Sequence, residues 1–86
     1  MIRNHIKNMT PELCKAARAL TGLTQKELAE AACIATPTIA DFERGARKPH
    51  ANNIKSITNV FENRGIDFIE ENGEIIGIKF NRLKKS

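Results

Sequence analysis

The stretch from residue 24 to residue 45 constrains the fold most, because it predicts two short helices joined by a bend of three residues. Thr24 and Glu27 are the ends of a Thr-x-x-Glu capping box. In such a box the hydroxyl of Thr24 accepts a hydrogen bond from the amide of Glu27, and the carboxylate of Glu27 accepts one from the amide of Thr24. This pattern predicts a helix over about residues 25–32, whose inward-facing residues are Leu28, Ala29 and Ala32.

The bend at residues 33–35 leads into a second short helix. Ile39 and Phe42 form its buried stripe, and Gly45 ends it. Either Ala35 or Thr36 is expected to cap its first turn. The loop at residues 46–49 contains Arg, Lys and Pro and stops the helical run.

Two further helices flank this pair. Thr10-Pro11-Glu12 is a helix start, with a threonine cap, a proline at the first helical position and an acid in the positively polarised first turn. The sequence predicts these helices over about residues 11–21 and 51–63, closed by Gly22 and Gly65. Their inward-facing residues are predicted to be Leu13, Ala17 and Leu20 in the first, and Ile54, Ile57, Val60 and Phe61 in the second.

From Gly65 onward the apolar residues recur with a period of about two, which indicates β-strands. Asn72-Gly73 between two such runs is the strongest short signal for a hairpin. A tight turn there pairs Ile69 with Ile76 and Asp67 with Ile78. In this register one face carries Ile69, Ile76, Ile78 and Phe80, and the other carries Ile66, Phe68 and Ile75.

Both faces of the predicted hairpin are therefore partly apolar, and a small helical bundle covers only one of them. An isolated two-stranded hairpin is marginal in water and exposes two strand edges. We expect the hairpin to pair or pack with the hairpin of a second chain. The residues assigned to this dimerisation surface are Ile69, Ile76, Ile78 and Phe80.

The 86 residues carry a formal net charge of +4, which weakly favours a polyanionic partner. The charge is unevenly distributed, because the charged residues within 66–74 are all acidic and those within 75–86 are all basic. The acids are Asp67, Glu70, Glu71 and Glu74. A surface that faces phosphates should exclude this acidic segment.

Several classes of function are disfavoured. Cys14 and Cys33 lie far apart and are interpreted as reduced, and with His5 and His50 they complete no metal-ligand pattern. We expect no metal and no cofactor. No nucleophile lies near a base in the sequence, and no glycine-rich phosphate loop is present, so we expect no enzyme. No segment approaches the about 20 apolar residues of a membrane span, and the N-terminus lacks a signal-peptide pattern, which favours a cytoplasmic protein without a membrane partner.

The segments GLTQKELAEAA and TIADFERGARKP resemble the helix-turn-helix of the xenobiotic-response-element family, which includes lambda-type repressors and Cro proteins. The resemblance covers about residues 10–61 and implies a mainly α fold, a lambda-repressor-like bundle of four to five helices, here followed by the β-hairpin. Residues 10–65 are then the DNA-binding domain and residues 66–81 the dimerisation hairpin. Residues 1–9 are an N-terminal extension that need not be ordered, and residues 82–86 are a basic tail.

The resemblance also implies how double-stranded DNA is bound. In this family the second helix of the motif enters the major groove, and the first crosses the DNA backbone. By position, the base-facing residues are Thr36, Pro37, Thr38 and Asp41, and the phosphate-contacting residues are Gln25, Arg44, Arg47 and Lys48. Arg18 and Glu43 match a family pair that bridges two helices and sets the angle of the reading helix; the alternative is two separately solvated side chains.

Two positions depart from the family pattern. Cys33 stands where the family usually has glycine, so a left-handed backbone there would cost on the order of 1 kcal/mol. Asp41 aims a carboxylate at a polyanion. It either accepts a hydrogen bond from a cytosine amino group, or is a solvated helix residue, or indicates that the helix meets a protein.

The function expected from these residues is that of a sequence-specific DNA-binding regulator, interpreted as a repressor of bacterial or phage type. It would act as a homodimer on a two-fold operator, because the base-facing residues offer modest discrimination in one subunit. The alternative is a protein-interaction module or antitoxin-like protein that uses the same scaffold to bind a protein partner such as a toxin.

Overall fold

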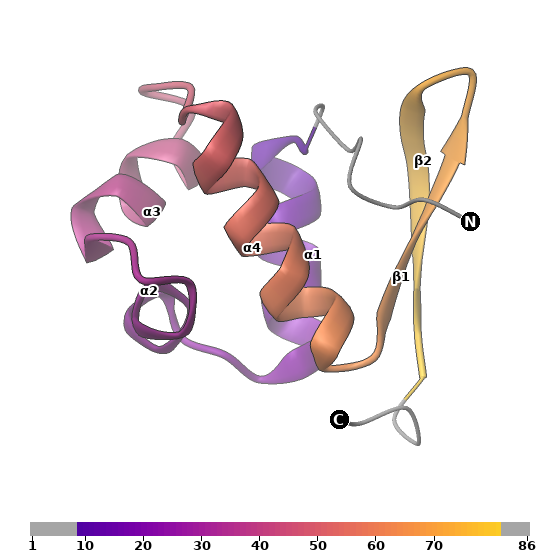
Figure 1. Ribbon diagram of the computed structural model, residues 1–86, viewed down its shortest axis with the longest axis horizontal. Coiled ribbons are helices and arrows are strands. Elements are labelled where there is room, and N and C mark those ends of the chain that lie inside the picture. The colour runs from indigo at the N-terminus through magenta and orange to yellow at the C-terminus, as the bar shows by residue number, and fades with distance from the viewer. Residues whose placement is uncertain (1–8, 82–86) are drawn as a thin grey trace.

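The computed structural model describes residues 9–81, which form four helices followed by one hairpin (Figure 1). The elements are α1 (Pro11–Thr21), α2 (Gln25–Ala32), α3 (Thr36–Glu43), α4 (Ala51–Asn63), β1 (Ile66–Glu71) and β2 (Glu74–Phe80). The mainly α fold and the predicted bounds of α1, α2 and α4 are confirmed. The basic tail at residues 82–86 and the extension up to residue 8 lie outside the described residues.

The helix ends follow the local sequence signals. The hydroxyl of Thr10 accepts a hydrogen bond from the amide of Leu13 over 3.1 Å at the start of α1. The capping box of α2 has both of its hydrogen bonds, from the amide of Glu27 to the hydroxyl of Thr24 over 3.0 Å and from the amide of Thr24 to the carboxylate of Glu27 over 2.9 Å. At α3, Ala35 takes the cap position and contributes no side-chain hydrogen bond.

One apolar core lies between the helices and the inner face of the hairpin. Its buried members are Met9, Cys14, Ala17, Leu28, Ala29, Ala32, Ile39, Phe42, Ile54, Ile57, Phe61, Ile66 and Phe68. The prediction for Leu20 was wrong, because 41% of this residue is exposed. The buried stripe of α1 is centred on Cys14 and Ala17, and Leu20 lies at its margin.

The Asn72-Gly73 turn closes the hairpin as predicted, with φ values of 55° and 84°. Two residues beyond the turn the strands depart from the predicted register, because β2 contains a β-bulge at Ile76. The prediction was wrong for two pairs, whose observed partners are Gly77 for Ile69 and Lys79 for Asp67.

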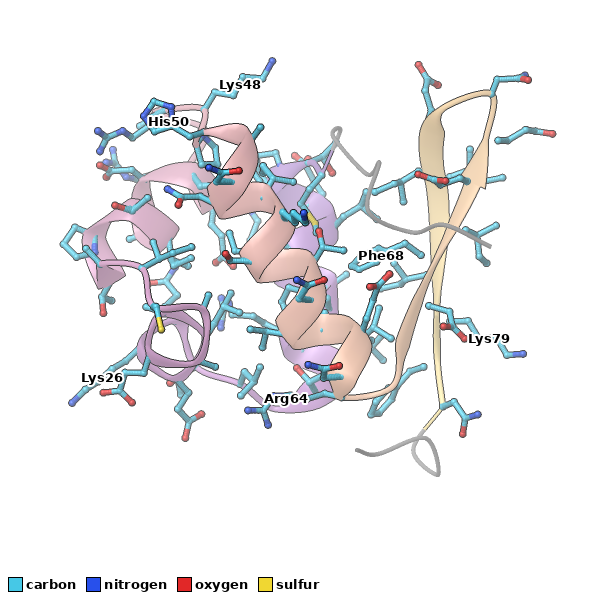
Figure 2. All side chains as sticks on the ribbon, viewed as in Figure 1. Lys26, Lys48, His50, Arg64, Phe68 and Lys79 are labelled. Carbon is cyan, nitrogen blue, oxygen red and sulfur yellow. The ribbon has the colours of Figure 1, made fainter. Side chains whose placement is uncertain are left out.

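The bulge reverses the faces of the remaining part of β2. The apolar side chains on the face toward the helices are Ile66, Phe68, Ile75, Ile78 and Phe80. Figure 2 shows Phe68 pointing from β1 toward the helices. Ile69 and Ile76 stay outside, with 45% and 59% of each exposed, so the predicted dimerisation surface is divided between two faces. Burial of one face of a sheet specifies the register of its strands. Here the bulge allows Ile78 and Phe80 to pack against the core, which favours the observed register.

Gly65 ties the root of the hairpin together. Its φ of 100° is left-handed, and a Cβ atom at this position would lie 2.3 Å from the carbonyl oxygen of Asn81. The amide of Asn81 in turn donates a hydrogen bond to the carbonyl of Gly65 over 2.8 Å. Only glycine permits this close return of the chain after β2.

The two functional regions expected from the sequence lie at opposite ends of the molecule. Figure 1 shows α2 and α3 at one end, the hairpin at the other, and α1 and α4 between them. The acidic segment of the hairpin is thus remote from α3, as expected for a phosphate-facing surface at the α2–α3 end. Within residues 9–81, no helix combines the length and apolar character that a membrane span requires.

Candidate nucleic-acid interface

The first turns of α3 present the four side chains predicted to face bases. Pro37 is exposed, and Thr36, Thr38 and Asp41 are half-buried. Because Ala35 is the cap residue, Thr36 is the first helical residue and its hydroxyl does not cap the helix. The structure therefore places a compact surface of two threonines, a proline and a carboxylate on the outer side of α3.

Arg18 and Glu43 lock α3 to α1. The Nε atom of Arg18 lies 2.7 Å from Oε2 of Glu43, and its Nη2 atom lies 2.8 Å from Oε1. This is the two-point geometry in which arginine binds a carboxylate most strongly. Only 3% of the Glu43 side chain is exposed, compared with 22% for Arg18. The pair fixes the C-terminal turn of α3, and with it the direction in which the helix is presented.

The Glu43 carboxylate accepts two further hydrogen bonds, from the Cys14 thiol over 3.1 Å and from the Gln25 amide over 3.0 Å. Burial alone would raise the pKa of Glu43, but the hydrogen bonds from Arg18, Gln25 and Cys14 hold it below its ordinary value. Burial, reinforced by the bond to Glu43, raises the pKa of Cys14, so the thiol remains a donor. Cys14 was not predicted to contact Glu43. The sequence feature that indicates this contact is its position four residues before Arg18, which places both side chains on the same side of α1.

Gln25 therefore has a contact that the sequence did not predict. A primary amide has two N–H groups, and Gln25 donates one of them to Glu43. Gln25 is the first residue of α2, where backbone amides also lack helical partners. The arrangement holds the side chain at the N-terminus of α2 with one N–H group still available to an anion.

Asp41 lies between two arginines. Its Oδ1 atom is paired with Nη2 of Arg44, three residues along the same helix, and its Oδ2 atom lies 3.7 Å from Nη1 of Arg47. Arg47 comes near because the chain turns back at Gly45, whose φ is 77°, and the amide of Ala46 donates to the carbonyl of Asp41 over 2.9 Å. Asp41 was predicted to face a base, and Arg44 and Arg47 were predicted to contact phosphates. In the structure the Asp41 carboxylate interacts directly with both arginines.

Two lysines and a histidine lie near α3. Figure 2 shows Lys48 and His50 directed outward beside the loop that follows α3, and Lys26 directed outward from α2. All three side chains are exposed. Lys26 was passed over in the sequence, although its place in the first turn of α2, next to Gln25, is a usable signal. A polyanion lying along α2 and α3 would meet positive charge on both sides of the reading helix.

The comparisons with known proteins agree with this geometry. The helix-turn-helix family model matches residues 15–69, which is more than half of the chain and includes all four helices in whole or in part. No curated protein matches the sequence. Members of this family regulate through DNA binding and are not normally enzymes. The chain therefore belongs to the helix-turn-helix family of DNA-binding regulators related to the xenobiotic-response-element and lambda-repressor proteins.

Proposed function

We propose that the protein is a sequence-specific transcriptional repressor that binds a two-fold operator as a homodimer, with α3 in the major groove. The observation that carries the proposal is the separation of charge. The exposed cations Arg44, Arg47 and Lys48 gather around the end of α3, while the acidic hairpin occupies the opposite end of the molecule.

The base-reading surface is small and its chemistry is mixed. The methyl groups of Thr36 and Thr38 and the ring of Pro37 suit contact with thymine methyl groups, and the threonine hydroxyls suit phosphates or base edges. Asp41 suits the amino group of cytosine. Phosphate contacts from the second N–H group of Gln25 and from Arg47 and Lys48 would hold α3 in the groove. Such a reader depends on two subunits for useful specificity.

The position of the hairpin decides how two copies can combine on one operator. A two-fold operator needs both reading helices on the same side of the dimer, with half-sites about 34 to 36 Å apart. Stacking the outer faces of two hairpins would point the two α3 helices in opposite directions, because α3 and the outer face lie at opposite ends. Pairing two hairpins edge to edge keeps both α3 helices on one side. We therefore assign the dimer contact to a strand edge, with Ile69 and Ile76 on the outer face of the joined sheet.

Selection of bound fragments from genomic DNA, followed by a salt titration on the best fragment, tests the operator proposal. Selected DNA should bind at least about a thousandfold more tightly than random DNA of the same length. Equal binding to both would remove the operator proposal and favour the protein-partner alternative.

Cys33 provides a probe for the dimer. It is exposed at the bend before α3, whereas Cys14 is buried, so a thiol-reactive spin label should modify Cys33 selectively. Edge-paired dimers should give a label-to-label distance on the scale of the half-site spacing, about 34 to 36 Å. Stacked outer faces should give a much longer distance, approaching twice the 30 Å length of one subunit. A monomer in sedimentation, both alone and on selected DNA, would contradict the dimer.

A further inference from the structure

The Asp41 carboxylate lies between the guanidinium groups of Arg44 and Arg47. One oxygen is paired with Arg44 and the other faces Arg47 at 3.7 Å. About a third of the Asp41 side chain, 31%, is exposed, compared with 67% for Arg44 and 59% for Arg47. Both arginine side chains are therefore more exposed to solvent than the carboxylate that they contact.

A phosphodiester and a carboxylate offer arginine the same kind of partner. Each presents two anionic oxygens, and each accepts charge-assisted hydrogen bonds from guanidinium N–H groups. The N–H groups that Arg44 and Arg47 direct at Asp41 cannot bind a DNA phosphate at the same time. A phosphate that takes these N–H groups must therefore displace the carboxylate of Asp41.

We infer that the Asp41 carboxylate substitutes for a DNA phosphate within the protein. In the free protein it pairs with Arg44 and Arg47, and on DNA binding it releases both arginines to the DNA backbone. The inference rests on the proposed DNA-binding function. After the exchange, the carboxylate of Asp41 faces the major groove without its two cations. A base edge that donates a hydrogen bond, such as the amino group of cytosine, would satisfy it, whereas other base edges would leave it opposed to a polyanion.

This exchange couples two kinds of recognition that usually act separately. Phosphate contacts position a protein on DNA, and base contacts specify the sequence. Here, full use of the phosphate contacts exposes a carboxylate whose partner depends on the base pair below it. Asp41 thus weakens binding to random DNA and acts as a specificity residue at one base position.

A double-mutant cycle on a random-sequence duplex tests the exchange. The four proteins are the wild type, Asp41→Asn, Arg44→Gln with Arg47→Gln, and the triple variant, each checked for helical content by circular dichroism. Anisotropy titrations at one salt concentration should show that Asp41→Asn raises affinity about three- to tenfold in the wild-type background. In the background without the two arginines, the same change should raise affinity by a clearly smaller factor, because it removes only the repulsion between Asp41 and the DNA.

Simple repulsion between Asp41 and DNA predicts a different pattern. Asp41→Asn would then raise affinity equally in both backgrounds, and this result would overturn the exchange, as would no gain in either background. Glu71→Gln removes the same charge at the hairpin tip and should change affinity less than about twofold, because the charge lies beyond a Debye length of about 10 Å from the DNA. Failure of every variant to bind any duplex would instead contradict the proposed function itself.

Discussion

Gln25 at the start of α2 donates a hydrogen bond over 3.0 Å to Glu43 at the end of α3, so a residue expected to touch DNA also joins the two helices of the motif. Glu43 is the common acceptor for residues from α1 and α2, and its own helix carries the base-facing side chains. The orientation of α3 is therefore set by one buried carboxylate and the donors around it.

Replacing Gln25 with alanine should affect stability and DNA binding together. Loss of a hydrogen bond to a partly buried charged group should lower the free energy of unfolding by about 1 to 2 kcal/mol, measured by urea denaturation. DNA affinity should also fall, but the salt dependence of binding should not change, since the amide is neutral. Lys26→Ala, at the exposed neighbouring residue, is the matched control and should leave the stability nearly unchanged. An unchanged stability in Gln25→Ala would contradict the contact with Glu43.

Glu43 should make stability depend on pH in the acidic range. Its pKa in the folded protein is lowered, so its ionised form stabilises the fold above its unfolded-state pKa, about 4.3, and this contribution is lost as the pH falls through the folded-state value. Glu43→Gln should be less stable than the wild type by about 2 to 4 kcal/mol at neutral pH, because it leaves Arg18 without its counter-charge. The difference should shrink steadily below about pH 4.5 in urea titrations. A gap that stays constant with pH would be inconsistent with an ionised Glu43, and Glu30→Gln, at an exposed residue of α2, is the control for the loss of a surface carboxylate.

Arg47 and Lys48 should account for part of the salt dependence of DNA binding. Each phosphate contact contributes about 0.9 to the slope of log affinity against log salt concentration. Arg47→Ala and Lys48→Ala should each weaken binding to random and selected DNA alike and flatten this slope by about 0.9. Lys79→Ala removes a cation from the hairpin, at the far end of the molecule in Figure 2, and should leave the slope unchanged. A slope that does not respond to either loop variant would place the DNA elsewhere.

Cys33 should carry backbone strain. Its φ of 59° and ψ of 44° are left-handed, a conformation that costs a residue with a side chain about 1 to 2 kcal/mol. Glycine would remove this strain but would add flexibility to the unfolded chain, so Cys33→Gly should stabilise the protein by a net amount of up to about 1 kcal/mol. Asn72→Gly is the matched control, because asparagine tolerates this conformation better, and its effect should be smaller. A loss of stability in Cys33→Gly would show that the thiol makes an interaction of its own.

The helices were predictable because their signals are local. Each signal is close in sequence to the helix that it predicts. The capping box at Thr24 and Glu27 marks the start of α2, and the apolar spacing of α4 is contained in α4 itself. The bulge at Ile76 was not predictable in this way, because it depends on how Ile78 and Phe80 meet a core assembled from distant helices. The turn chemistry of Asn72-Gly73 specifies only the first pairs beyond the loop.

The candidate site shows the same division. The family resemblance indicated which positions of α3 face outward and that Arg18 lies near Glu43. It gave no sign that Cys14 and Gln25 would share that carboxylate, since those contacts require three helices to be in place. The contact between Asp41 and Arg47 depends on the path of the chain after Gly45, which the sequence marks only as the end of a helix.

The bulge in β2 has a consequence for how this chain tolerates changes in length. In most strands, loss of one residue moves every later side chain to the opposite face. Here Ile76 is the residue without a partner, and the pairs on either side of it are already in phase. A chain that lacked Ile76 would run as a regular hairpin through the same pairs, with Ile78 and Phe80 still facing the helices. The position at which the hairpin is most irregular is thus a position in β2 where a deletion would leave the inward and outward sides of the sheet as they are.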